Sequence, residues 1–222
     1  MNDKYTQAWQ SSVSDPETFW GKAAESLDWS SRPTRAYDAA QGWFPGGTLN
    51  TCWNCVDRHV ANGHGDRTAL IYDSPVTSTV HNYTYAALQD EVSRVAAMLV
   101  SLGVTKGDRV IIYMPMVPPT VFAMLACARL AAIHSVVFGG FAAHELAKRI
   151  DDAKPVLLLT ASCGIEGART IAYKPMVDEA LGKDLMSFGT PILVLGDPGQ
   201  LPPVSGGGYF TNQEPDYLLT DI

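Results

Sequence analysis

The sequence predicts an α/β fold with a partial parallel sheet and crossover helices, preceded by an irregular Trp-rich N-terminal arm. Three observations lead to this prediction. Apolar residues repeat at helical spacing in several segments between residues 84 and 151. Short apolar runs of strand length alternate with those segments. All five tryptophans lie in the first sixty residues, where Gly and Pro divide the chain into short pieces.

The N-terminal arm carries its tryptophans at Trp9, Trp20, Trp29, Trp43 and Trp53. No long periodic element accompanies them, so we expect the arm to pack its aromatic side chains onto a larger body. A helix is expected directly after residues 48–50 and should end at Gly63. Its apolar residues at helical spacing are Leu49, Trp53, Val56 and Val60.

Beyond the arm, helices and strands are expected in alternation. Thr84 can cap a helix that ends at Gly103, and its apolar face consists of Leu88, Val92, Val95, Leu99 and Leu102. The later elements are a strand over 109–114, a helix over 120–131, a strand over 134–138, a helix over 142–151 and a strand over 156–160. Strands separated by helices at this spacing form a parallel sheet with crossover connections.

The charge of the chain changes near Pro175. Residues 1–175 carry 16 acidic and 15 basic side chains, whereas residues 176–222 carry seven acidic side chains and one basic side chain, Lys183. We therefore expect three parts: an N-terminal extension over 1–65, a partial α/β domain over 66–175, and a separate segment over 176–222. The apolar run at 192–195 could add a strand to the sheet.

Composition excludes several classes of function. The net charge of −7 disfavours a surface that binds nucleic acid through phosphate contacts. Four cysteines are too few for a disulfide framework, and the N-terminus has no apolar signal segment, so we expect a cytoplasmic protein. The uncharged run 110–128 is interrupted by three prolines, so we expect no membrane span.

Soft metal ligands occur at Cys52, Cys55, His59 and His64. The first three fall on one continuous predicted helix, where they cannot all surround one ion, so we expect no metal site.

A pair of glycines follows the predicted strand 134–138. Gly139 and Gly140 come directly after Phe138 and before a predicted helix. Ligands of open α/β sheets bind at such strand ends, and glycines let the backbone approach a phosphate-bearing ligand. Glycines in strand–helix turns are commonly turn residues only, so the pair alone is a weak indication of a site.

The surrounding sequence resembles the AMP-forming acetyl- and propionyl-CoA synthetases. The matching segments are DPETFW (15–20), WFPGGTLN (43–50), NCVDRH (54–59), GDRVIIYMPM (107–116), AMLACAR (123–129) and HSVVFGGF (134–141). ASCGIE (161–166), continuing to YKP (173–175), is closer to the propionyl branch. The resemblance covers about the first 175 residues.

This resemblance implies an enzyme that activates acetate or propionate with ATP to an acyl-adenylate and then transfers the acyl group to CoA. It implies that Phe138, Gly139 and Gly140 lie along the CoA path and that Arg169 pairs with a CoA phosphate. Ala168 precedes that arginine where glycine is expected. Without the resemblance, Arg169 would be a solvated surface arginine.

Other parts of that family are not found in the sequence. There is no Ser/Thr/Gly-rich phosphate loop followed by Lys, and no C-terminal domain with its lysine for adenylation. Those parts stabilise the charge of adenylyl transfer. We therefore expect a truncated short-chain acyl-CoA synthetase that is inactive as it stands, with residual CoA or nucleotide binding and no catalytic residue of its own.

The last part of the chain suggests a different resemblance. MVDE (176–179) and ILVLGDPGQLPPV (192–204) resemble motifs II and III of superfamily 1 DNA helicases of the exonuclease V type. That resemblance implies that Asp178 holds Mg²⁺, Glu179 activates water and Gln200 senses the γ-phosphate of ATP. No G-x-x-x-x-G-K-[ST] loop occurs, so an acidic first turn of a helix is the simpler interpretation of Asp178 and Glu179.

Three hypotheses follow. The first is a synthetase N-terminal region fused near Pro175 to a helicase-like fragment. The second is a fragment of a helicase ATPase core. The third is a non-enzymatic interaction fragment, because an incomplete sheet leaves apolar faces and edges exposed.

Overall fold

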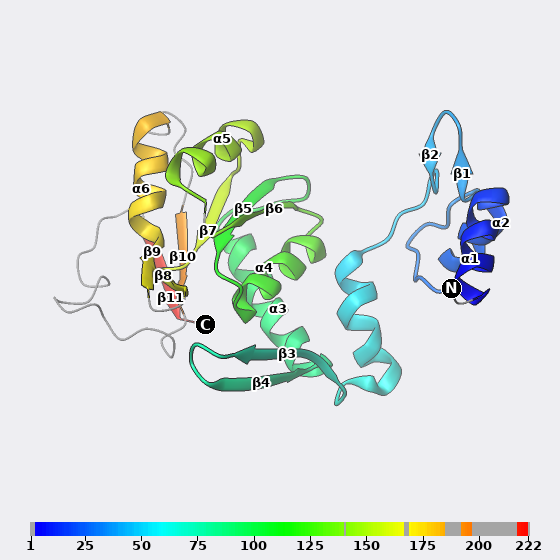
Figure 1. Cartoon of the computed structure of the whole chain (residues 1–222), viewed down its shortest axis with the longest axis horizontal. Coiled ribbons are helices and arrows are strands. Elements are labelled where there is room, and N and C mark those ends of the chain that lie inside the picture. The colour runs from blue at the N-terminus through cyan, green and yellow to red at the C-terminus, as the bar shows by residue number, and fades with distance from the viewer. Residues whose placement is uncertain (1–2, 140, 167–168, 185–191, 197–216, 222) are drawn as a thin grey trace. The chain divides into compact units, whose positions relative to one another are not determined.

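The computed structural model describes residues 3–139, 141–166, 169–184, 192–196 and 217–221 (Figure 1). Its contacts divide the chain into two units, Met1–Arg58 and His59–Ile222. The second unit contains the sheet and the candidate site.

The first unit is less irregular than expected, because it begins with two helices. They are α1 (Asp3–Ser14) and α2 (Pro16–Ala24). Asp15 caps α2 by accepting a hydrogen bond from the Thr18 amide at 3.2 Å, and Pro16 suits the first helical position. The short strands β1 (Tyr37–Asp38) and β2 (Gly42–Trp43) then pair antiparallel.

The aromatic side chains of the first unit contact one another. Trp43 lies 5.9 Å from Trp20 and 5.0 Å from Tyr37, measured between ring centroids. Trp29 lies 5.6 Å from Phe44. These contacts form a small aromatic cluster within the arm, whereas packing onto a larger body stays a prediction.

The helix predicted to end at Gly63 is confirmed. Residues 51–64 are helical and include two π-helical turns, η1 (Trp53–Asp57) and η2 (Val60–His64). Gly63 has a positive φ of 78°, which suits the end of a helix.

The centre of the second unit is a five-stranded parallel sheet in the order β11-β10-β7-β5-β6. Its strands are β5 (Arg109–Met114), β6 (Ile133–Phe138), β7 (Leu157–Thr160), β10 (Ile192–Gly196) and β11 (Tyr217–Asp221). The predicted parallel sheet is confirmed, and the run at 192–195 adds a strand beside β7. Part of the segment after Pro175 thus belongs to the same sheet.

Helices cover both faces of this sheet (Figure 1). They are α3 (Tyr85–Ser101), α4 (Pro118–Arg129), α5 (Ala143–Ala153) and α6 (Tyr173–Asp184). α3 packs on α4, which contacts β5 and β6, while α5 packs on α6. Thr84 caps α3 as predicted, because its hydroxyl accepts a hydrogen bond from the Ala87 amide at 3.1 Å.

Alternation along β5 places its side chains in two cores. Ile111 and Tyr113 belong to a buried cluster with Leu146 of α5 and Val177 of α6. Val110, Ile112 and Met114 are also buried and point to the opposite face. A strand buried on both faces is typical of a central parallel strand.

Two antiparallel hairpins complete the second unit. The first consists of β3 (Thr68–Ser74) and β4 (Thr79–Thr84), and the second of β8 (Cys163–Glu166) and β9 (Arg169–Ala172). The sequence did not predict either hairpin. The second connects β7 to α6 and carries Arg169.

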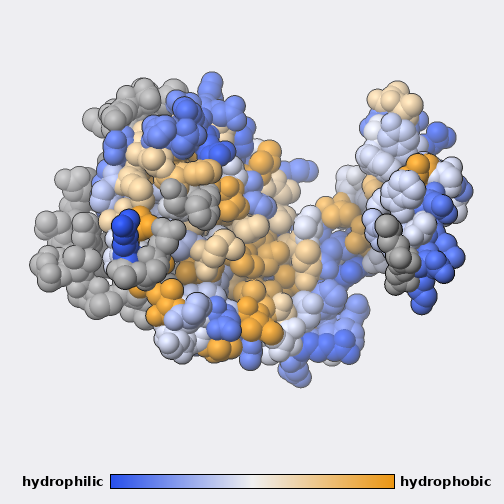
Figure 2. Space-filling view, in the orientation of Figure 1, coloured by the Kyte–Doolittle hydropathy of each residue, from blue (hydrophilic) through white to orange (hydrophobic). Residues whose placement is uncertain are grey.

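Apolar side chains are also found on the surface of the second unit. Figure 2 shows hydrophobic surface in the region of α3 and α4. Ile133 and Val136 of β6, the last strand in the sheet order, are 57% and 43% exposed. None of the helices in the described part of the chain combines the length and the apolar character needed to cross a bilayer.

Candidate functional site at the carboxyl edge of the sheet

Three strands end at one level of the sheet and define the candidate site. In the register of the sheet, Met114 of β5 lies opposite Phe138 of β6, and Tyr113 lies opposite Thr160 of β7. The segments that follow these strands therefore begin at the same edge. Ligands of open α/β sheets bind at this carboxyl edge.

Gly139 begins the loop after β6, and a neighbouring ring fills the space beside it. A Cβ atom built on Gly139 would lie 1.8 Å from the Oη atom of Tyr173 and 2.6 Å from its Cζ atom. No side chain can occupy that space while Tyr173 stays in place. The structure thus gives Gly139 a packing reason to be glycine, in addition to the close ligand approach that the sequence suggested.

Gly164 of β8 contacts the same ring. A Cβ atom on Gly164 would lie 2.8 Å from the Cε2 atom of Tyr173 and 3.4 Å from the Cβ atom of Pro115. Tyr173 is only 4% exposed, and its backbone amide donates a hydrogen bond to the carbonyl of Ser162 at 3.1 Å. The first residue of α6 therefore contacts two glycines from two different segments of the edge.

Tyr113 supports the same region from the sheet. Its ring centroid lies 4.9 Å from that of Tyr173, and its hydroxyl donates a hydrogen bond to the carbonyl oxygen of Phe141 at 2.8 Å. The Sδ atom of Met176 lies 3.5 Å from the same hydroxyl. Burial raises the pKa of Tyr113, so it stays protonated and able to donate at neutral pH.

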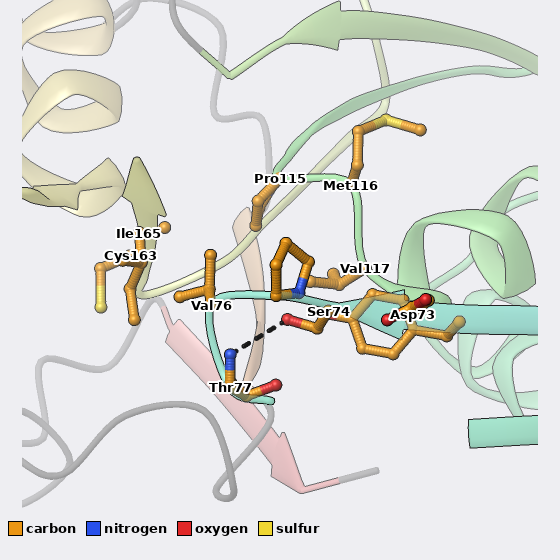
Figure 3. A pocket seen from close by; sticks show the side chains of 12 residues that line it. Asp73, Ser74, Val76, Thr77, Pro115, Met116, Val117, Cys163 and Ile165 are labelled. Carbon is orange, nitrogen blue, oxygen red and sulfur yellow. Dashed lines mark hydrogen bonds between the residues drawn. The ribbon is translucent and has the colours of Figure 1, made fainter. Parts of the chain in front are cut away.

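The turn after β5 lines a small cavity. Thr120, which is buried, donates a hydrogen bond through Oγ1 to the Pro115 carbonyl at 2.7 Å and so fixes the start of α4. The cavity has a volume of about 220 Å³, and its walls come from residues 72–77, 115–117 and 163–165. Figure 3 shows Val76 and Thr77 of the β3–β4 turn facing this cavity together with Pro115, Val117 and Ile165.

Cys163 lies in the wall of this cavity. Burial is the main influence on its thiol and raises the pKa, while the Ser162 hydroxyl, 3.9 Å from Sγ, lowers it to a smaller extent. A thiol with a raised pKa is a poor nucleophile at neutral pH. The cavity therefore has a few polar groups in its lining, but Cys163 is not an activated nucleophile.

Basic side chains surround the first turns of α5, directly after the glycine loop. His144 and Lys148 are exposed, and both approach the carboxylate of Glu145, at 3.3 and 2.8 Å. The Arg149 guanidinium lies 4.9 Å from the centre of the Phe141 ring. The amino end of a helix together with the cations Lys148 and Arg149 favours an anionic ligand. This feature was not predicted from the sequence, although HELAKR (144–149) carries the signal in its charge pattern.

Arg169 is exposed at the start of β9, opposite Glu166 in the register. Ala172, at the other end of β9, precedes Tyr173. Three residues of strand span roughly 10 Å. Arg169 therefore lies at the outer end of a hairpin whose inner end packs beside Gly139 through Tyr173.

The remaining predicted CoA residues are only partly described. Phe138 is the last residue of β6, where its backbone pairs with Met114. Gly140 lies outside the described residues. Tyr173 thus links the two parts of the predicted CoA site, because it packs against Gly139 and directly follows the hairpin that carries Arg169.

The residues of the helicase interpretation lie elsewhere. Asp178 and Glu179 are exposed in the middle of α6, and the Nζ atom of Lys174 lies 2.8 Å from Oδ2 of Asp178. The alternative interpretation placed this pair in the first turn of a helix. That position is wrong, because α6 already begins at Tyr173. Gln200 lies outside the described residues.

The Cys–His group of the arm does not form a metal centre in the described part of the structure. Cys52 is buried and Cys55 is exposed, so the two thiols of this helix point to different environments.

Two family models match the chain. The acetyl-coenzyme A synthetase N-terminus family matches residues 5–55, and the AMP-binding enzyme family matches residues 57–198. The second match continues beyond Pro175, where the sequence analysis placed a fusion. No support is found for a helicase-like fragment.

Relatives and solved structures agree with these matches. Acyl-CoA synthetase short-chain family member 3, mitochondrial, from Bos taurus is 52% identical over 182 residues, which are 80% of this chain and 26% of that protein. Propionate–CoA ligase from Salmonella typhimurium is 44% identical over 183 residues, which are 81% of this chain and 29% of that protein. The structure of acetoacetyl-CoA synthetase from Streptomyces lividans matches with a TM-score of 0.77 and 25% identity, covering 95% of this chain and 31% of that one.

The chain thus spans less than a third of the length of these relatives. Over that span, both family models follow one another in the order expected for a synthetase, and the sheet has the matching fold. The chain belongs to the AMP-binding enzyme family and corresponds to the N-terminal region of a short-chain acyl-CoA synthetase.

Proposed function

We propose that this chain provides part of the CoA-binding surface of a short-chain acyl-CoA synthetase that uses acetate or propionate. The observation that carries the proposal is the meeting of the Gly139 loop with the base of the Arg169 hairpin at the carboxyl edge of the sheet. Ligands of this class of fold bind at that edge.

The chemistry of CoA fits the groups at this edge. CoA carries phosphates that need cations and backbone N–H groups, and Arg169 offers a guanidinium fork that can hold a phosphate with two hydrogen bonds. Lys148, near the start of α5, adds a second exposed cation near the loop that follows Gly139. Phe138, Gly139 and Gly140 would then line the path of the ligand.

The proposal does not assign the whole reaction to this chain. In the family, ATP and Mg²⁺ supply the adenylate that CoA then attacks, and a phosphate loop and a catalytic lysine stabilise that step. The sequence contains no such loop. We therefore propose ligand binding without acyl-adenylate formation by this chain alone, in a cytoplasmic setting and without a nucleic-acid partner.

The domain limits remain part of the proposal. We assign residues 1–65 to an N-terminal extension and residues 66–175 to a partial adenylate-forming domain. For residues 176–222, the pairing of β10 with β7 supports a continuation of that domain rather than a helicase-like fragment. In the helicase alternative, Asp178 and Glu179 would bind ATP–Mg²⁺, but both are exposed in the middle of α6 and no support is found for a helicase-like fragment.

The test is calorimetric titration of the purified full chain with CoA and, separately, with ATP–Mg²⁺. We expect heat with CoA and about a tenfold to hundredfold loss of affinity in Arg169→Ala, because a charge-assisted hydrogen bond contributes about 1.5–3 kcal/mol. Heat with ATP–Mg²⁺ that disappears in Asp178→Asn would favour the helicase alternative instead.

The matched control is Arg94→Ala. Arg94 is an exposed arginine on α3 that pairs with Glu91 at 2.6 Å, three residues earlier on the same helix, so its removal changes the net charge equally without touching the proposed site. Equal losses of CoA affinity in both variants would show that Arg169 acts only through net charge, and that the proposed site is wrong.

A further inference from the structure

We propose that Tyr173 is a positioning residue that holds the Gly139 loop and the Arg169 hairpin at a fixed separation. This inference rests on the proposed function, since it concerns how the two parts of the CoA surface stay together. Tyr173 itself touches no ligand in this proposal.

The first step is the fit of the ring between two backbones. On one side, a Cβ on Gly139 would meet the phenol oxygen at 1.8 Å, and on the other side a Cβ on Gly164 would meet the Cε2 atom at 2.8 Å. Real Cβ atoms do not approach other atoms so closely. The hydroxyl-bearing end of the ring therefore acts as a spacer that sets the distance between the β6–α5 loop and strand β8.

The second step is that the spacer itself is fixed. Tyr173 is 4% exposed, its amide donates to the Ser162 carbonyl at 3.1 Å, and its ring contacts that of Tyr113 with centroids 4.9 Å apart. Tyr113 also holds the far side of the glycine loop, by donating to Phe141 at 2.8 Å. Because the ring is buried in a close-packed interior, it cannot move without displacing the groups that contact it.

The third step concerns Arg169. The hairpin β8–β9 carries Arg169 at its outer end, and its inner end joins directly to Tyr173. A change of the spacer tilts the hairpin, and a small change at the base is enlarged at the tip. Arg169 and Gly139 can serve one ligand only while the spacer keeps their separation.

The test is a double-mutant cycle on CoA affinity, measured by calorimetry with the full chain. In the wild type, Arg169→Ala should weaken CoA about tenfold to hundredfold. In a Tyr173→Ala background the same substitution should change the affinity by less than about threefold, because the arginine no longer reaches the ligand held at the glycine loop. Tyr173→Phe keeps the ring and should retain most of the coupling.

A control variant shows what the loss of a ring with a merely structural role would do. Tyr85→Ala removes a half-buried ring at the start of α3, which contacts His59 at 4.5 Å, and should lower the melting temperature without changing the effect of Arg169→Ala. If Tyr173→Ala does not fold, Tyr173→Leu, which keeps a large apolar side chain, and Gly164→Ala, whose added Cβ must displace the ring, are compared in the same way.

The outcomes separate the two proposals. No CoA binding by a wild-type chain that melts cooperatively overturns the proposed function and this inference together. CoA binding that depends equally on Arg169 in the wild type and in every folded Tyr173 variant overturns the positioning role alone. Loss of that dependence only in the Tyr173 and Gly164 variants supports it.

Discussion

The hydroxyl of Tyr113 lies 2.8 Å from the carbonyl oxygen of Phe141, so a side chain of the central strand β5 holds the loop that follows β6. Tyr113 is fully buried, and Phe141 lies two residues beyond Gly139. A substitution of Tyr113 on β5 should therefore alter the position of the glycine loop.

The first prediction concerns this hydrogen bond. Tyr113→Phe keeps the ring but leaves the Phe141 carbonyl without this donor, which should lower the free energy of unfolding by about 1 kcal/mol. Chemical denaturation monitored by circular dichroism measures the change. The control is Tyr5→Phe, since Tyr5 is an exposed residue of α1, and it should have no measurable effect. Equal stability of Tyr113→Phe and wild type would contradict the role given to the hydroxyl.

The second prediction concerns Cys127 of α4 and alkaline pH. Burial raises the pKa of this thiol from 9.0 to about 12, outweighing a smaller opposing hydrogen bond from its own backbone. The unfolded chain therefore loses the thiol proton at a lower pH than the folded chain does. The contribution of this thiol to the free energy of unfolding is fully present below pH 9. It declines by about 1.4 kcal/mol per pH unit as the pH rises toward 12.

This contribution is isolated by comparing wild type with Cys127→Ala. Urea unfolding at pH 8.5 and at pH 10.5 should show a smaller loss of stability in the variant, because alanine has no proton to lose. The difference should reach about 2 kcal/mol. Parallel stability curves for the two proteins over this range would mean that the thiol is not buried as the structure shows.

The sequence was most informative where burial on both faces imposes an uninterrupted apolar run. Strand β5 was predicted with its observed limits, because Arg109 and Pro115 bracket five apolar residues. The α3 cap at Thr84 was also predicted, since capping depends on residues close in sequence. Local chemistry of this kind does not depend on the rest of the fold.

Long-range packing explains what the sequence left open. The β3–β4 hairpin is mostly exposed on both faces, so its residues show little periodic signal. Pro175 suggested a boundary, but it lies in the first turn of α6, where proline is tolerated. The contact between Tyr173 and Gly139 joins distant parts of the chain, and neither residue reveals it alone.

The third prediction concerns the end of α5. Lys154 has a left-handed backbone with φ of 45°, a conformation that glycine adopts without steric cost. Lys154→Gly should therefore raise the free energy of unfolding by about 0.5–1 kcal/mol. Lys148→Gly, inside the same helix, is the matched control and should lower it by about 1 kcal/mol. A decrease in both variants would exclude a left-handed residue at this position.

The last prediction concerns the carboxylate of Glu17 in the N-terminal arm. Its two oxygens accept hydrogen bonds from the amides of Ala36 at 2.9 Å and Tyr37 at 3.0 Å. These bonds, led by that from Ala36, lower the pKa of Glu17 below its usual value of 4.5. Because the folded-state pKa is depressed, the stabilisation is present above pH 4.5 and is lost as pH falls below that value.

Tryptophan fluorescence can follow this loss in the arm alone, because all five tryptophans lie in residues 1–58. The Trp43 ring lies 5.0 Å from that of Tyr37, whose amide is one of the two donors to Glu17. The wild-type emission should therefore shift as pH falls below 4.5. Glu17→Gln should already be shifted at pH 7 and should respond less to acid, since its amide does not titrate. The control is Glu25→Gln, at the exposed end of α2, which should behave as wild type. If the emission of Glu17→Gln at pH 7 is the same as that of wild type, the carboxylate does not hold the β1 segment in place.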